Sequence, residues 1–186
     1  MPKPTTNRTQ SYTYRDYVTW DGPERWELIA GMPYLMASPT PEHQRVLGEL
    51  FVQVHQAVAG TGCTVYMAPL DLTFDPDDRT DTVVQPDLFV MCGAWGHETR
   101  IVGVPSLVVE IISPSTATND TIRKLNLYQR VGVPEYWIVE PDARILNVYL
   151  HDGTLLRWTA DYHPGNQVRS TALPQLVIAV QSIFPS

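Results

Sequence analysis

Cysteine is scarce in this chain: Cys63 and Cys92 are the only two among 186 residues. Neither has another Cys or a His at the spacing typical of metal ligands, and one pair alone makes neither a disulfide framework nor a zinc site. We therefore expect a protein of the reducing cytoplasm.

Long apolar runs are missing as well. No segment approaches the roughly 18 consecutive apolar residues that a membrane-spanning helix needs. Residues 1–11 are polar and contain no apolar core of signal-peptide length. The expectation is a soluble protein that is not exported and has no membrane partner.

Positive charge is in deficit, with 13 Lys and Arg against 20 Asp and Glu and a net charge of -7. This balance argues against broad, non-specific binding of nucleic acid through a basic surface. The argument weakens if several acids cluster to hold a cation, because bound Mg²⁺ reverses the local charge where a phosphate approaches.

The length, with 44% hydrophobic residues, allows one well-buried core and is too short for two ordinary domains. Residues 1–11 are rich in Pro, Thr and Asn, and we expect them to form a disordered tail. A single domain is expected over residues 12–186.

Capping residues and apolar spacing predict three helices. Thr13 is expected to cap a short helix that extends through Tyr17 to Trp20. The clearest helix begins at Pro41, and apolar residues repeat at helical spacing until Gly60. A further helix is expected over residues 118–131.

Strand-like runs occupy much of the rest, and the first two flank an Ala30-Gly31 dipeptide that is typical of a tight hairpin. The expected strands span residues 26–29, 32–37, 63–68, 70–74, 82–91, 106–112, 135–140, 145–150, 155–158 and 176–180.

The order helix, strands, helix, strand predicts an α/β (α+β) fold, with a mixed sheet flanked by a helix on each face. A strand that is buried on both faces loses its polar alternation. Residues 107–112 show this loss and are expected to form a central strand.

Glu110 is the most informative residue, because it interrupts the apolar run Leu-Val-Val-Glu-Ile-Ile. Alternation places it on one strand face with Val108 and Ile112. An ionised carboxylate there costs several kcal/mol or more unless it is paired, protonated or bound to a metal. One alternative to metal binding is an internal ion pair with Arg or Lys.

Asp87 follows Pro86 in a second expected strand, where Gln85, Asp87 and Phe89 share one face. A proline inside a strand marks a bulge or a strand edge, which splays the neighbouring strands and admits a ligand. The alternative for Asp87 is a turn at a strand end.

The two acids are 23 residues apart, which leaves one loop between two adjacent strands and lets the carboxylates converge. Mg²⁺ is usually held by one or two carboxylates together with water and substrate phosphate oxygens. Asp87 and Glu110 are therefore a sufficient protein contribution for phosphoryl chemistry with Mg²⁺ or Mn²⁺.

Lys124 lies near the start of the second long helix, 14 residues after Glu110. A lysine there can position or deprotonate an attacking water and stabilise the charge that develops on phosphorus. The alternative is an ordinary solvated helix lysine.

Three weaker candidates accompany these residues. Glu27, in Trp-Glu-Leu-Ile, is a candidate for hydrogen bonding to metal-bound water, and Gln85 is an auxiliary candidate on the Asp87 face. His43 lies in the first turn of the long helix, where a histidine is more often a surface or capping residue than a ligand.

A Pro-Asp dipeptide, then a buried Glu in a strand, then a Lys on the next helix, resembles the PD-(D/E)XK nuclease superfamily. More narrowly, the chain resembles the prokaryotic restriction-endonuclease family known as Uma-two from about Tyr12 to the C-terminus. The motifs that carry this resemblance are Glu27-Leu-Ile-Ala-Gly, His43 after Ser-Pro-Thr-Pro, Val-Gln-Pro-Asp87, Val-Val-Glu110-Ile-Ile-Ser-Pro-Ser, Lys124-x-x-x-Tyr128 and Gly-Val-Pro-Glu-Tyr-Trp137.

The resemblance implies a restriction-endonuclease-like fold, a divalent metal on Asp87 and Glu110, Lys124 as catalytic lysine, Glu27 as auxiliary acid, and frequent homodimers. The chain departs from the superfamily at Ile112, where the lysine usually stands two residues after the Glu. The lysine must then come from the helix. The chain also has Ala30 in place of the usual Asp of the Asp-Gly turn.

The sequence therefore predicts a Mg²⁺-dependent endonuclease with DNA as its substrate. The alternative is a non-catalytic binding or assembly module that keeps the fold, which the acidic composition and the lack of a recognisable DNA-reading element favour. A glycosidase with paired carboxylates is a weaker third reading, because it needs an aromatic sugar platform and an acid with a raised pKa.

Overall fold

The computed structural model describes residues 4, 10–93, 99–112 and 117–184, without the side chains of 117–120. Most of the tail predicted over residues 1–11 lies outside this part of the chain. The chain divides into two compact units: unit 1 comprises Met1–Ser38, Pro69–Gln85 and Trp95–Gly103, and unit 2 comprises Pro39–Ala68, Pro86–Ala94 and Val104–Ser186. The single domain over residues 12–186 stays a prediction.

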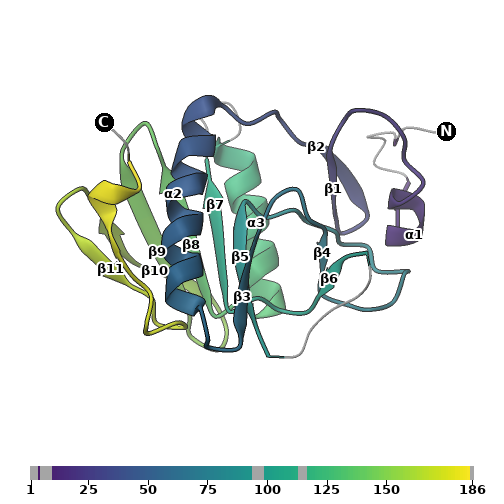
Figure 1. Ribbon diagram of the computed structural model, residues 1–186. Helices are drawn as coiled ribbons and strands as arrows, with labels where there is room; N and C mark the ends of the chain where they lie inside the picture. The colour runs from purple at the N-terminus through teal and green to yellow at the C-terminus, as the bar shows by residue number, and fades with distance from the viewer. Residues whose placement is uncertain (1–3, 5–9, 94–98, 113–116, 185–186) are drawn as a thin grey trace. The chain divides into compact units, whose positions relative to one another are not determined.

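Unit 2 is built on a six-stranded sheet in the order β10-β9-β8-β7-β5-β3 (Figure 1). Its strands are β3 (Cys63–Met67), β5 (Leu88–Cys92), β7 (Leu107–Ile111), β8 (Glu135–Glu140), β9 (Ile145–His151) and β10 (Leu156–Tyr162). The β7 and β8 strands are parallel and the other neighbours antiparallel, which confirms the mixed sheet. The β7 strand is central and fully buried, as its apolar run predicts.

Helices α2 (Pro41–Val58) and α3 (Ala117–Val131) lie on opposite faces of this sheet, as expected (Figure 1). The α2 helix is capped by the Thr40 side chain and begins at Pro41, as the sequence predicts. Its apolar stripe packs in the main core, where Leu107, Val109 and Ile111 of β7 are also buried. The alternate residues of β7 therefore face α3, and Glu110 is one of them.

The C-terminal part of unit 2 forms a small antiparallel pair, β11 (Gln167–Arg169) and β12 (Val177–Ala179), followed by the short 3-10 helix η1 (Val180–Ser182). Buried apolar residues of this segment join the core on the α2 face. The predicted strand over residues 176–180 is thus present in a shorter form.

Unit 1 contains helix α1 (Tyr14–Tyr17), the hairpin of β1 (Trp26–Ile29) and β2 (Met32–Leu35), and the parallel pair β4 (Leu72–Thr73) and β6 (Ile101–Val102). The predicted Ala30-Gly31 turn is confirmed. Both of its residues have positive φ, 51° at Ala30 and 76° at Gly31. That conformation suits glycine and strains alanine, so the Ala departs from the preferred turn chemistry without preventing the turn.

The prediction of one continuous strand over residues 82–91 is wrong. Val83 and Val84 form isolated bridges to Leu28 and Leu72 in unit 1, whereas β5 begins only at Leu88 in unit 2. Pro86 lies at the break, where a residue without a backbone N–H cannot continue the ladder.

The two cysteines, which the sequence analysis did not expect to form a disulfide framework, are joined by a disulfide in the structure. They occupy directly opposed positions on β3 and β5, Cys63 facing Cys92. Disulfides persist mainly in oxidising compartments, so this bond weakens the argument for a reducing cytoplasm.

No helix among the described residues is long and apolar enough to cross a membrane.

Candidate active site

The register of β5 and β7 brings the two predicted acids to the same place in unit 2. Leu88 pairs with Val109 in this antiparallel ladder, so Asp87, one residue before β5, stands opposite Glu110. The predicted arrangement of two carboxylates on neighbouring strands is therefore present.

Asp87 is fixed by two contacts to a single carboxylate oxygen. Its Oδ2 accepts a hydrogen bond of 2.7 Å from the backbone N–H of Ile111 and lies 3.1 Å from Nε2 of His43. His43 reaches this position because the Thr40 cap, which accepts from the His43 backbone N–H, sets the first turn of α2. The structure thus brings His43 to the predicted site. The second ring nitrogen of His43, Nδ1, is buried, and no described residue forms a hydrogen bond with it.

Glu110 accepts two bonds on its Oε1 atom, at 3.0 Å from Nζ of Lys124 and at 2.7 Å from the hydroxyl of Tyr128. All three side chains are buried, and Lys124 is only 4% exposed. The internal ion pair that the sequence left open as an alternative is present, with Lys124 as the cation. Lys124 is not a solvated helix lysine.

Lys124 and Tyr128 come from one face of α3, because residues four apart on a helix are neighbours. This face lies over Glu110 of β7. Tyr128 is the residue that the sequence analysis did not assign a role, although its spacing from Lys124 was visible and could have identified it as a second donor to Glu110.

The donor set suits a hard divalent cation. Asp87 uses only Oδ2 in its contacts with described residues, which leaves Oδ1 for a ligand, and carboxylate oxygens are the ligands that Mg²⁺ prefers. No group of three or more His, Cys, Asp or Glu residues suited to a metal occurs in the part of the chain that the structure describes. Two carboxylates with water and phosphate oxygens are enough for Mg²⁺, whereas an all-protein cage is excluded there.

Glu27 and Gln85, the remaining candidates, belong to unit 1 and contact each other. The buried Glu27 carboxylate accepts a 2.8 Å hydrogen bond from the backbone N–H of Gln85. The Gln85 side chain bonds to Arg25 and to Asp71. Gln85 does not share a strand face with Asp87 as predicted, because the strand is interrupted at Pro86.

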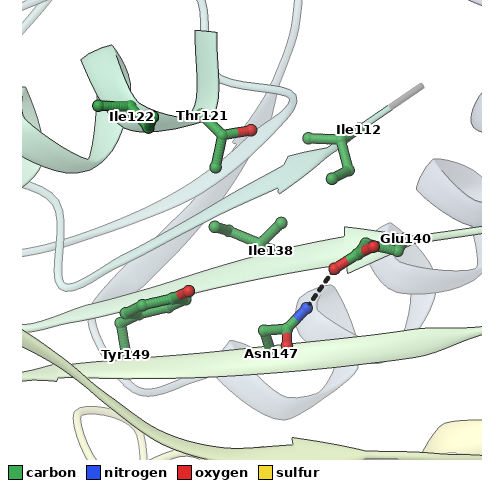
Figure 2. A pocket seen from close by; sticks show the side chains of 7 residues that line it. All are labelled: Ile112, Thr121, Ile122, Ile138, Glu140, Asn147 and Tyr149. Atoms are coloured by element: carbon green, nitrogen blue, oxygen red, sulfur yellow. Dashed lines mark hydrogen bonds between the residues drawn. The ribbon is translucent and has the colours of Figure 1, made fainter. Parts of the chain in front are cut away.

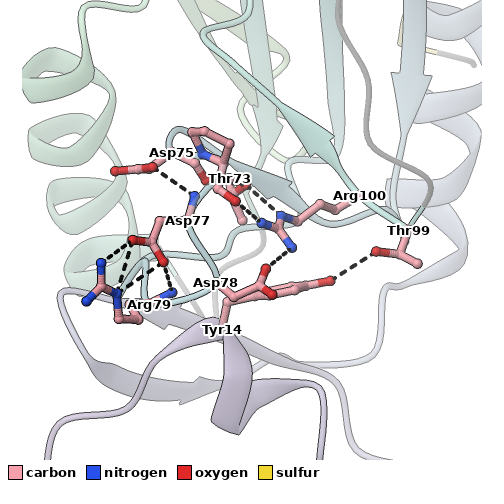
Figure 3. A network of polar contacts seen from close by, with 9 residues as sticks. Tyr14, Thr73, Asp75, Asp77, Asp78, Arg79, Thr99 and Arg100 are labelled. Atoms are coloured by element: carbon pink, nitrogen blue, oxygen red, sulfur yellow. Dashed lines mark hydrogen bonds and ion pairs between the residues drawn. The ribbon is translucent and has the colours of Figure 1, made fainter.

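A second polar network in unit 1 surrounds the buried guanidinium of Arg100 (Figure 3). Arg100 donates to Thr73 and to the backbone carbonyl of Pro76, pairs with Asp78 at 3.0 Å, and lies over the Tyr14 ring. Three of its N–H donors have acceptors on Thr73, Pro76 and Asp78, so this network stabilises the acidic loop that follows β4. Of the acids in this loop, Asp78 pairs with Arg100 and Asp77 pairs with Arg79.

Comparison with known proteins gives a family and a fold. The family model described as "Putative restriction endonuclease", named Uma2, matches residues 14–181. Among solved structures, the chain is similar to a "putative nuclease belonging to DUF820" from Anabaena variabilis, with a TM-score of 0.75 and 17% identity. That match covers 93% of this chain and 97% of the other. A search of curated proteins finds no match.

Proposed function

Because the chain belongs to the Uma2 restriction-endonuclease family, we propose that it is a Mg²⁺-dependent endonuclease that hydrolyses DNA phosphodiester bonds. The observation that carries the proposal is the convergence of Asp87, Glu110 and Lys124 in unit 2. Two carboxylates and one ammonium in a buried setting form a donor set for cation and phosphate together.

Asp87 and Glu110 are the proposed ligands of Mg²⁺ or Mn²⁺. When bound, such an ion polarises the phosphoryl oxygens and lowers the pKa of a coordinated water. The protein's own part is positional: the Ile111 backbone N–H and His43 hold the Asp87 carboxylate, and Tyr128 holds Glu110. Fixed ligands of this kind lose little freedom when the substrate arrives.

Lys124 is proposed to hold or move a proton at the attacking water and to stabilise charge on the phosphate. Its Nζ lies 3.0 Å from Glu110 Oε1, so the ammonium is already directed at the centre. An ammonium that is buried beside a carboxylate acts more strongly than one in water, because the local dielectric is lower.

The experiment is cleavage of supercoiled, linear and single-stranded DNA by the full chain, with Mg²⁺, Mn²⁺ or chelator. We expect cleavage that requires a divalent cation and is abolished by Asp87→Ala. The exposed Asp142→Ala, which removes a carboxylate from a surface turn of unit 2, is the matched control and should retain activity. Metal-independent cleavage, or an active Asp87→Ala protein, would contradict the proposal.

The role of Lys124 has a separate test. Lys124→Met should reduce the single-turnover rate by about 10²-fold or more, the scale of a lost proton-transfer or transition-state contact. Arg130→Met, which removes an exposed cation from the same helix, should leave the rate nearly unchanged. Similar losses in both variants would show that Lys124 contributes only general electrostatic attraction for phosphate.

A non-catalytic binding module is the second candidate, favoured by the net charge of -7 and by the ion pair that already occupies Glu110. It predicts no cleavage of any DNA form under any metal. The same assay therefore separates the two functions.

Four finer proposals follow. DNA is proposed as the substrate in preference to RNA on the family description, and Glu27 is proposed as an auxiliary acid on the motif resemblance. Homodimers are proposed on that resemblance too. A cytoplasmic location is retained as a proposal because the chain shows no long apolar helix in its described part, although the Cys63–Cys92 disulfide counts against it.

A further inference from the structure

The Cys63–Cys92 disulfide lies at the outer edge of the six-stranded sheet of unit 2. It joins β3, which ends the strand order, to its neighbour β5. Cys92 is exposed and Cys63 is partly exposed. An exposed disulfide is open to attack by a thiolate and is more easily reduced than a protected structural one. The position of this bond therefore allows exchange with thiols in solution.

The same two strands hold the backbone of Asp87. The β3–β5 ladder continues in unbroken register from the disulfide to Met67, which pairs with Leu88. One residue further along, the backbone N–H of Ala68 donates a 3.1 Å hydrogen bond to the backbone carbonyl of Asp87. The disulfide thus closes one end of this ladder, and the proposed metal ligand lies at the other end.

The bond also closes the loop that carries Asp87. The chain leaves unit 2 after Ala68 and returns to it at Pro86, and the residues between these two belong to unit 1. Within the sheet, β5 is also paired with β7, whereas β3 is paired with β5 alone among the described strands. Reduction therefore frees the outer strand and keeps the inner pairing, so we expect a local opening at β3.

The chemistry of the pair fits a reversible bond. The chain has only these two cysteines, so exchange cannot move the disulfide to another position. In a cytoplasm, the glutathione pool reduces exposed disulfides, and the few that form there are usually transient and redox-sensing. A reversible bond therefore reconciles the disulfide with a protein that acts on DNA in such a compartment.

We propose that Cys63 and Cys92 form a thiol switch that controls how tightly Asp87 holds its metal ion. Oxidised glutathione is the electron acceptor: its S–S bond breaks, the Cys63–Cys92 bond forms through a mixed disulfide, and two molecules of reduced glutathione leave with the two thiol protons. The oxidised form fixes the β3–β5 ladder and binds the cation more tightly. This inference rests on the proposed function, because it takes Asp87 as a metal ligand.

Thiol exchange in the full-length protein is the first test. An excess of reduced glutathione should open the disulfide and yield two thiols, and oxidised glutathione should close it again, as counted by mass spectrometry after alkylation. A structural disulfide resists reduced glutathione and opens only with dithiothreitol, and that result would overturn the proposal.

NMR of the folded protein tests whether the ladder transmits the change. Reduction should shift the amide signals of Ala68 and Asp87, at the far end of the ladder from the disulfide. The β8–β9 pair, where Asn147 donates to Glu140 across the two strands (Figure 2), is the internal reference and should keep its signals. Shifts confined to the sequence neighbours of the two cysteines would contradict a switch.

Mn²⁺ binding connects the switch to the site. Reduction should weaken binding by about five-fold, the low end of typical coupling between sites, under conditions where both forms are folded. Cys63→Ser/Cys92→Ser should bind like the reduced form and should not respond to glutathione, and Asp87→Ala should lose binding in both forms. No binding in either form of the wild-type protein would refute the metal site, whereas equal binding in the two forms would refute the switch alone.

Discussion

Glu110 and Lys124 face each other in a buried setting, at 6% and 4% exposure, and each compensates the charge of the other. Removing one partner from such a pair leaves an uncompensated charge in a medium that solvates it poorly. The Glu110 carboxylate is therefore part of the stability of unit 2 as well as a ligand. Neutralising a lone buried acid would stabilise the protein, whereas neutralising Glu110 leaves the charge of Lys124 uncompensated.

Glu110→Gln should destabilise the protein in the absence of metal by about 3 kcal/mol, the low end of the cost of breaking a buried ion pair. The glutamine can still accept from Tyr128, so the change isolates the charge. Urea denaturation in chelator measures it. A more stable Glu110→Gln protein would mean that the Lys124 contact contributes little.

The double variant Glu110→Gln/Lys124→Met is the control for this interpretation. It removes both charges, so it should be less destabilised than Glu110→Gln alone. The coupling between the two sites is the loss in the double variant minus the losses in Glu110→Gln and in Lys124→Met measured singly. Additive losses would show that Lys124 stabilises the protein independently of Glu110.

The residues of the site were predictable to different extents. Glu110 stood out because a charge interrupted an apolar strand, and Lys124 needed the family resemblance, since a helix lysine is ordinarily solvated. That the two form an ion pair required the strand register and the placement of α3. Tyr128 was visible only through its spacing from Lys124, and its hydrogen bond to Glu110 likewise required the placement of α3.

At the scale of elements, the break at Pro86 separates two segments that looked like one strand. Residues 82–91 show the alternation and the β-branched side chains that are typical of a strand. Both halves of the segment do pair with neighbours, but in different units. Local pattern cannot tell which partner each half finds, because pairing depends on contacts far away in the sequence. The helices were predicted better, since α2 and its cap are determined by neighbouring residues.

The cross-strand disulfide makes an element-scale prediction. Cys63 and Cys92 close a loop with a sequence separation of 29 residues, and restricting such a loop in the unfolded chain corresponds to about 3.5 kcal/mol. Treatment with dithiothreitol should lower the urea midpoint of the wild-type protein. Thiol titration should find no free thiol before reduction and two after it.

The matched control is Cys63→Ser/Cys92→Ser, whose stability should resemble that of the reduced protein and should not respond to the reductant. A wild-type protein with two reactive thiols as purified would contradict the disulfide. It would also restore the argument for a reducing compartment.

For the whole molecule, the division into two compact units raises the question of what limits stability in each. Unit 2 has a long sheet and the larger core, whereas unit 1 is held by a short hairpin and by polar networks. One of these networks places the Tyr17 hydroxyl against Asp71 and Gln85. The stability of unit 1 therefore depends on the protonation of a buried phenol.

Tyr17 predicts a loss of stability in alkali. Burial, followed by the charge of Asp71, raises its pKa well above the ordinary value of 10.0. A raised pKa means that the folded state keeps the proton, so the contribution is complete below pH 10 and is lost as the pH rises, because the unfolded state then releases the proton first. At pH 11 the loss from this group is about 1.4 kcal/mol.

Tyr17→Phe cannot ionise, so its stability should fall less between pH 8 and pH 11 than that of the wild-type protein, whatever its stability at pH 8. Urea denaturation at the two pH values measures the difference, and comparing the variants cancels the other tyrosines. Tyr162→Phe, on the edge strand β10 of unit 2, removes a phenol outside this network and is the control for the substitution itself. Equal losses for Tyr17→Phe and wild type would show that the Tyr17 hydroxyl meets solvent in the folded state, and that the polar network of unit 1 does not hold it against Asp71.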